Sequence, residues 1–144
     1  MRHAKSTTER RTLYYPRGIF HPEDLIDFIQ LRPFAREWKR HGLSDNDLRE
    51  LETVLMADPL IGELVRGAGG LRKVRFAPDH WNMGKRGALR VCYGYFADIF
   101  KIVLAQVYRK NRKEDLTEAE KVAMRKTLPI IHEGFTRERK RKDA

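Results

Sequence analysis

Residues 71–90, LRKVRFAPDHWNMGKRGALR, carry the clearest structural signal in the chain. Basic and apolar residues alternate at its start, which places Lys73 and Arg75 on one face of a strand and Val74 and Phe76 on the other. The pattern predicts a β-hairpin with a positively charged face over an apolar one. Such a face suits a phosphate-rich ligand.

Two further apolar segments complete the predicted sheet. Residues 88–96 and 100–109 are rich in Val, Ile, Tyr and Phe, and a short turn separates them. This composition is typical of two antiparallel strands. If these strands lie beside the first one, Arg90 and Lys110 extend its basic face.

Helices are predicted on both sides of these strands. A short strand at 25–31 precedes a helix at about 33–41, which has a proline in its first turn and a glycine after its end. Ser44 and Asp47 then form a pattern like a capping box, which predicts the start of a second helix.

The chain length of 144 residues fits one domain. Thr117 and Glu120 make a second capping box, which begins a final helix. We expect a flexible basic extension at 1–22, a folded domain at 23–135 and a charged, disordered tail at 136–144. The predicted class is α+β: a small antiparallel or mixed sheet of about four strands packs against N-terminal helices and a C-terminal helix. One sheet face is expected to stay free.

Composition restricts the partners and the compartment. Thirty Lys and Arg against 20 Asp and Glu give a formal charge of +10, which favours nucleic acid or an acidic protein as partner. No apolar run could span a bilayer, and the N-terminus lacks the apolar part of a secretory signal, so we expect a cytoplasmic protein without membrane attachment. Cys92 is the only cysteine, and its apolar neighbours favour burial over a nucleophilic role. The histidines show no metal-ligand spacing, and we expect no metal or other cofactor.

Three segments carry a resemblance to a known family: GLRKVRFA at 70–77, GKRGALRVCYGYF at 84–96 and FKIVLAQVYRKNRKEDLT at 100–117. In their order and spacing they resemble the RelE/ParE superfamily of bacterial type II toxins, most closely its HigB-like branch. The resemblance covers about residues 25–133 and implies a RelE-like fold. It also implies that the protein enters the A site of the 70S ribosome and cleaves mRNA there, and that an antitoxin from a neighbouring gene blocks it.

RNA cleavage by the 2′-OH needs a base for that proton, cations for the phosphorane and an acid for the leaving 5′ oxygen. The resemblance links Lys73 to proton abstraction and Arg75 to stabilisation of the leaving group or of the developing charge. It links Arg90 to the scissile phosphate, and Lys110 to a position where the family has another catalytic arginine. A lysine acts as a base only when neutral, and neighbouring positive charges favour that form.

Two features depart from the family pattern. RelE-type enzymes have a base-stacking tyrosine after the last basic position, and none follows Lys110 in RKNRKEDLT. His80, in the hairpin loop, is a further candidate proton donor, although a solvated loop histidine is the simpler interpretation. Five other basic residues are expected to bind the RNA backbone or the ribosome: Arg72, Lys85, Arg86, Arg112 and Lys113.

Two other functions remain open at the level of sequence. A ParE-like protein has the same scaffold but poisons DNA gyrase without cutting RNA. A module that only binds nucleic acid would have the basic face but no catalytic activity. For a toxin, operator DNA would be a further, indirect partner, contacted through the antitoxin.

Overall fold

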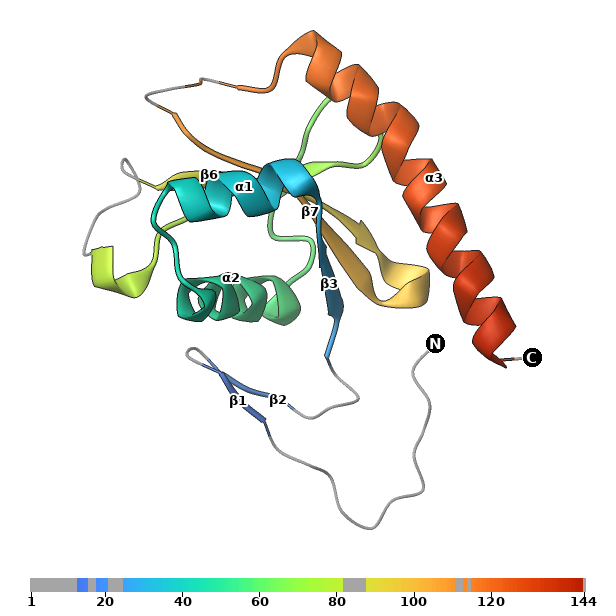
Figure 1. Ribbon diagram of the computed structural model, residues 1–144, viewed down its shortest axis with the longest axis horizontal. Coiled ribbons are helices and arrows are strands. Elements are labelled where there is room, and N and C mark those ends of the chain that lie inside the picture. The colour runs from blue at the N-terminus through green and yellow to red at the C-terminus, as the bar shows by residue number, and fades with distance from the viewer. Residues whose placement is uncertain are drawn as a thin grey trace.

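The computed structural model describes residues 25–81, 88–110, 113 and 115–143, and the backbone of two short strands, β1 (Leu13–Tyr15) and β2 (Gly18–Phe20). These two strands pair antiparallel and form a small sheet of their own (Figure 1). They lie within the segment that the sequence predicted only as an extension. Three-residue strands are too short for an alternating pattern to predict them.

The central element is a mixed five-stranded sheet in the order β3–β7–β6–β5–β4 (Figure 1). Its strands are β3 (Asp27–Gln30), β4 (Glu63–Leu64), β5 (Arg72–Phe76), β6 (Leu89–Phe96) and β7 (Lys101–Arg109). β3 runs parallel to β7, and the other neighbours are antiparallel. The predicted α+β class and the β5–β6 hairpin are confirmed. The fifth strand, β4, has two residues and adds an edge that the sequence did not predict.

Two helices, α1 (Arg32–Arg40) and α2 (Asp45–Ala57), lie on one side of the sheet (Figure 1). Their ends follow the local signals in the sequence. Gly42 has a φ of +72° just after α1, a conformation that glycine adopts without strain. Ser44 and Asp47 form the predicted capping box, because each side chain accepts a hydrogen bond from the other residue's backbone N–H.

The larger core lies between these helices and the sheet. Trp38 is 4% exposed, and its ring stacks on Phe34 at 5.3 Å and on Phe76 at 6.3 Å between centroids. Phe76 thereby fixes the apolar face of β5 towards α1. Because side chains alternate along a strand, Lys73 and Arg75 must point to the opposite face.

A long helix, α3 (Glu118–Asp143), covers part of that opposite face (Figure 1). Leu128 is 2% exposed and packs over Gly94 of β6, where a methyl group would lie only 3.1 Å from Leu128 Cδ2. Further along β6, the ring of Phe96 lies 4.8 Å from that of His132. The face that the sequence left free is therefore partly covered, over the second half of β6.

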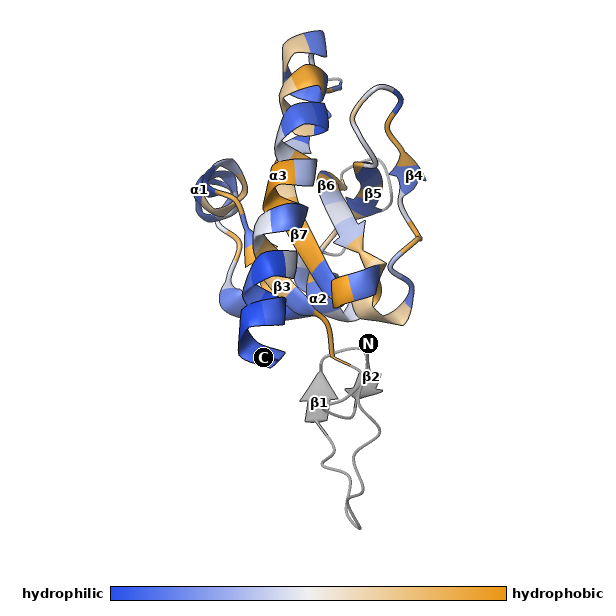
Figure 2. Cartoon of the chain, turned by 90° about the vertical axis from the view of Figure 1, so that its right-hand side faces the viewer, coloured by the Kyte–Doolittle hydropathy of each residue, from blue (hydrophilic) through white to orange (hydrophobic). Residues whose placement is uncertain are grey.

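The last turns of α3 lie where the sequence predicted a disordered tail. Charged residues four apart form ion pairs there, including Glu133–Arg137 at 3.7 Å and Glu138–Lys142 at 3.8 Å. Such pairs stabilise an exposed helix, and Arg139 also ties it to the rest of the protein by donating to the Asp98 carbonyl oxygen at 3.0 Å. Figure 2 shows this end of α3 as strongly hydrophilic. In the described part of the chain, no helix combines the length and the apolar character needed to cross a membrane.

Candidate functional site

Three side chains form a row across β5, β6 and β7. Arg75 lies directly opposite Arg90, and Arg90 lies directly opposite Tyr108. Opposite residues of paired strands project from the same face of a sheet. Tyr108 packs in the same core cluster as Leu128, so this is the face that α3 partly covers. We call Arg75, Arg90 and Tyr108 the cross-strand row.

The two arginines of the row have no acidic partner within the described part of the chain. Arg75 is exposed, whereas Arg90 is 6% exposed and donates one hydrogen bond, from Nη1 to the Ala88 carbonyl oxygen at 3.0 Å. Neither forms an ion pair with any residue that the structure describes. Like charges directly opposite each other destabilise a sheet, and buried charges are normally paired. Two arginines arranged in this way can bind an anion.

Tyr108 ends the row with a buried hydroxyl. The residue is 6% exposed, and among the described residues no hydrogen bond of normal geometry reaches its hydroxyl oxygen, although the Asp115 carboxylate lies near enough to interact with it. Burial raises the pKa of Tyr108 far above its ordinary value, and the nearby Cys92 thiol and Asp115 carboxylate raise it further. The hydroxyl therefore stays protonated at working pH and can donate a hydrogen bond to an anion.

Lys73 stands in the next row of the same face, opposite Cys92. Its Nζ lies 3.3 Å from Oδ1 of Asp115, in the segment between β7 and α3. The backbone N–H of Leu116 donates to the same carboxylate at 2.7 Å. That hydrogen bond and the charge of Lys73 lower the pKa of Asp115, although partial burial opposes them. An ionised carboxylate of the protein itself thus lies beside the cross-strand row.

A second ion pair lies next to this one. Lys113 donates to the carboxylate of Glu120 and stands 5.8 Å from the centre of the Tyr108 ring. Burial acts to raise the pKa of Glu120, but hydrogen bonds from Lys113 and Thr117 hold it below its ordinary value. Thr117 and Glu120 also form the predicted capping box at the start of α3. Lys113 therefore neutralises an acid of the protein as well as adding charge to this face.

The other residues predicted to act on RNA or to bind it lie outside the cross-strand row or outside the described residues. Lys110 is exposed and follows β7 directly, two positions after Tyr108. Lys85, Arg86 and Arg112 lie outside the described residues.

Arg72 and His80 do not join the row. Arg72 lies on β5 but on the opposite face, and its Nη1 donates to the carbonyl oxygen of Gly62 at 2.8 Å. His80 Nε2 lies 3.0 Å from Oδ1 of Asp47, a buried residue of α2. The neighbouring Trp81 packs against the core under α1 and α2. These contacts separate His80 from the basic face by the thickness of the sheet.

Sequence reasoning missed Tyr108 and Asp115. Alternation along β7 was a usable signal for Tyr108, because it lies two residues before Lys110. Nothing local marks Asp115, which meets Lys73 across 42 positions of chain.

Cys92 is fully buried beneath this face, and burial is the main cause that raises its pKa to about 12. An ordinary cysteine has a pKa of about 8.5. We predict that native protein at pH 8 resists alkylation by iodoacetamide, whereas protein unfolded in urea reacts fully within the same time. Mass spectrometry of the intact chain measures both. Rapid labelling of the native protein would contradict the buried, structural role.

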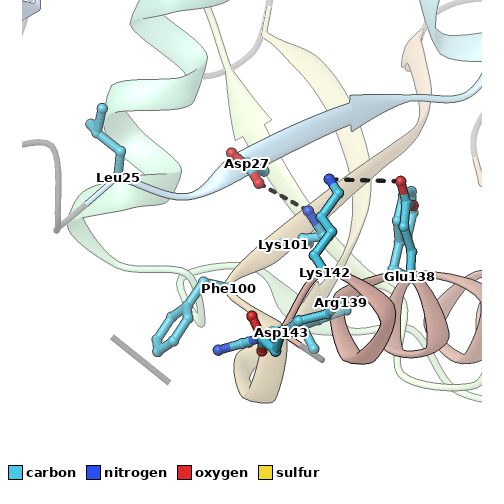
Figure 3. A pocket seen from close by; sticks show the side chains of 10 residues that line it. Leu25, Asp27, Phe100, Lys101, Glu138, Arg139, Lys142 and Asp143 are labelled. Carbon is cyan, nitrogen blue, oxygen red and sulfur yellow. Dashed lines mark hydrogen bonds and ion pairs between the residues drawn. The ribbon is translucent and has the colours of Figure 1, made fainter. Parts of the chain in front are cut away.

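A pocket of about 370 Å³ lies at the far end of α3, beside the start of β3 (Figure 3). Its charged side chains pair with each other, as Asp27 does with Lys101 at 2.9 Å and Glu138 with Lys142 at 3.8 Å. It contains none of the predicted site residues. Among the described residues, no group of three or more His, Cys, Asp or Glu side chains is placed to bind a metal ion.

No family model matches the sequence. One solved structure with some similarity is a double arginine-to-alanine mutant of the E. coli toxin RelE in the free state, at 14% identity and a TM-score of 0.45, over 62% of this chain and 88% of that one. Another is the intact E. coli RelBE toxin–antitoxin complex, at 14% identity and a TM-score of 0.44, over 58% of this chain and 95% of that one. Such values assign no family, so the functional proposal rests on the residues of the basic face.

Proposed function

We propose that this protein is the toxin of a type II toxin–antitoxin pair, an mRNA endoribonuclease of the RelE/HigB type that works on the translating ribosome. The observation that carries the proposal is the pair of opposed arginines, Arg75 and Arg90. The resemblance of the three basic segments to that superfamily, and the charge of +10, support it.

In the proposed reaction the RNA 2′ oxygen attacks the adjacent phosphorus and the bond to the 5′ oxygen breaks. The products are a 2′,3′-cyclic phosphate and a 5′-hydroxyl. Lys73 takes the 2′-OH proton in its neutral form, after the Asp115 carboxylate that pairs with it has moved away. Arg90 and Arg75 hold the phosphate oxygens as negative charge develops, and Lys110 stabilises the leaving 5′ oxygen, which takes a proton from water to become the 5′-hydroxyl. No metal is assigned a role, and His80 is left out because Asp47 binds it on the other side of the sheet.

The proposed partners follow from the same assignment. The mRNA lies in the A site of the 70S ribosome, where Lys113 and the basic residues at 85, 86 and 112 bind phosphates. A cognate antitoxin neutralises the basic protein and links it to operator DNA. The cytoplasm is the compartment in which all of these meet. An adjacent reading frame for a small acidic or helix-turn-helix protein would support the pair.

The test is a reconstituted translation reaction with purified protein and a defined mRNA. We expect cleavage only when ribosomes are present, with 5′-hydroxyl ends at the cuts. Arg75→Ala should slow cleavage by about ten- to a hundredfold, because it removes one donor to the phosphorane. Arg66→Ala removes one exposed arginine elsewhere on the chain and should leave the rate unchanged. Primer extension measures the sites and the rates.

Different products would point to the alternatives. Intact mRNA together with gyrase-linked DNA breaks would favour the ParE-like function. Binding of RNA with no cleavage, by both the wild type and Arg66→Ala, would favour a module without catalytic activity. Equal rates for the two arginine variants would remove the cross-strand row from the mechanism.

A further inference from the structure

We propose that the Tyr108 hydroxyl is a ligand for the bound RNA phosphate, and that the Asp115 carboxylate is an internal anion that this phosphate displaces. The inference rests on the proposed function and deepens it, because it adds two residues to the phosphate site. One of them strengthens binding and the other weakens it.

The first observation is that the Tyr108 hydroxyl forms no hydrogen bond of normal geometry with the described residues, and that the group acting on it is the Asp115 carboxylate. A buried polar atom without a partner costs free energy, so such atoms are rare unless they serve a ligand. Tyr108 lies opposite Arg90 in the same cross-strand row, so its side chain projects from the sheet face on which the arginine would hold a phosphate. A hydroxyl is a donor that can bind a phosphate oxygen without adding charge.

The second observation is the position of Asp115. Its carboxylate already occupies part of the basic face, because it binds Lys73 and its charge acts on both Tyr108 and Cys92. Its side chain is 50% exposed and comes from a short segment between β7 and α3, so it can leave without unpacking the core. Exposed ion pairs contribute little stability, so a phosphate with its greater charge can replace it at small cost.

A binding experiment separates the two roles. The probe is a fluorescein-labelled, single-stranded 2′-O-methyl oligoribonucleotide, whose blocked 2′ oxygen prevents cleavage. Fluorescence anisotropy with the full chain at fixed salt gives the Kd. Tyr108→Phe should weaken binding about tenfold, the loss expected for one hydrogen bond to a charged group. Asp115→Asn should tighten it several-fold, because a competitor is removed.

Matched controls exclude general effects. Tyr95→Phe removes a hydroxyl from the same sheet but from the face under α1 and α2, and should leave the Kd unchanged. Asp45→Asn changes the net charge as Asp115→Asn does, at an exposed position of α2, and should have a much smaller effect. Tyr108→Phe should melt close to the wild type, because the lost hydroxyl forms no hydrogen bond of normal geometry with the described residues.

The outcomes are distinct. If Tyr108→Phe binds like Tyr95→Phe and Asp115→Asn binds like Asp45→Asn, the inference is overturned, while ribosome-dependent mRNA cleavage by the wild type would keep the proposed function. If the affinities shift as expected but the wild type cuts no mRNA, the phosphate site stands and the nuclease proposal falls. A wild type that does not bind the probe overturns the inference outright.

Discussion

Arg90→Lys is expected to reduce mRNA cleavage by about a hundredfold or more while the protein stays folded. Removing one preorganised donor to a developing oxyanion typically costs a factor of this size. Lysine keeps the positive charge but loses the planar fork, with which an arginine can bind two oxygens of one phosphate. The rate of cleavage in the reconstituted translation reaction gives the loss directly.

The control for this variant is Arg109→Lys. Arg109 is on the neighbouring strand but faces the other way, where its guanidinium lies 4.5 Å from the centre of the Trp81 ring. Lysine can keep that contact with the aromatic ring, so cleavage should stay near the wild-type rate. Thermal melting of both variants reports folding. If Arg90→Lys cuts as fast as Arg109→Lys, Arg90 does not hold the scissile phosphate.

Much of the fold could be predicted because its signals are local. Ser44 and Asp47 start α2 through their own side chains, and Thr117 with Glu120 does the same for α3. Alternation along β5 predicted that Lys73 faces away from the core. The structure gives the reason, because Phe76 on the other face of the strand packs against Trp38. These signals act over a few residues, so a sequence displays them directly.

The parts that could not be predicted depend on contacts distant in the chain. Asp115 meets Lys73 across 42 positions of chain that include β6 and β7, and no short pattern shows that contact. The burial of Arg90 depends on neighbours from both sides of β6. Sequence reasoning treated the charged end of α3 as disordered because it lacks apolar residues, although its ion pairs support a helix. A high density of charged residues alone does not distinguish a disordered tail from an exposed helix.

Leu128→Ala should lower the free energy of unfolding by about 2–5 kcal/mol, the range for a large side chain deleted from a core. Leu128 is the only fully buried residue of α3 in the described structure, so it is the main apolar anchor of the helix on the sheet. Ile130→Ala is the matched control, because Ile130 lies in the same helix and is 69% exposed. Its effect should stay near about 0.5 kcal/mol or less. Urea denaturation measures both, and equal losses would contradict the anchoring.

The same contact predicts a coupling between two sites. A methyl group added at Gly94 would stand 3.1 Å from Leu128 Cδ2 in the wild type, so Leu128 must shift to admit it. In Leu128→Ala that crowding is gone, and the methyl group fills part of the cavity instead. Gly94→Ala should therefore lower the free energy of unfolding less, or raise it more, in the Leu128→Ala background than in the wild type. Additive free energies of unfolding in this double-mutant cycle would mean that α3 does not rest on β6 at this point.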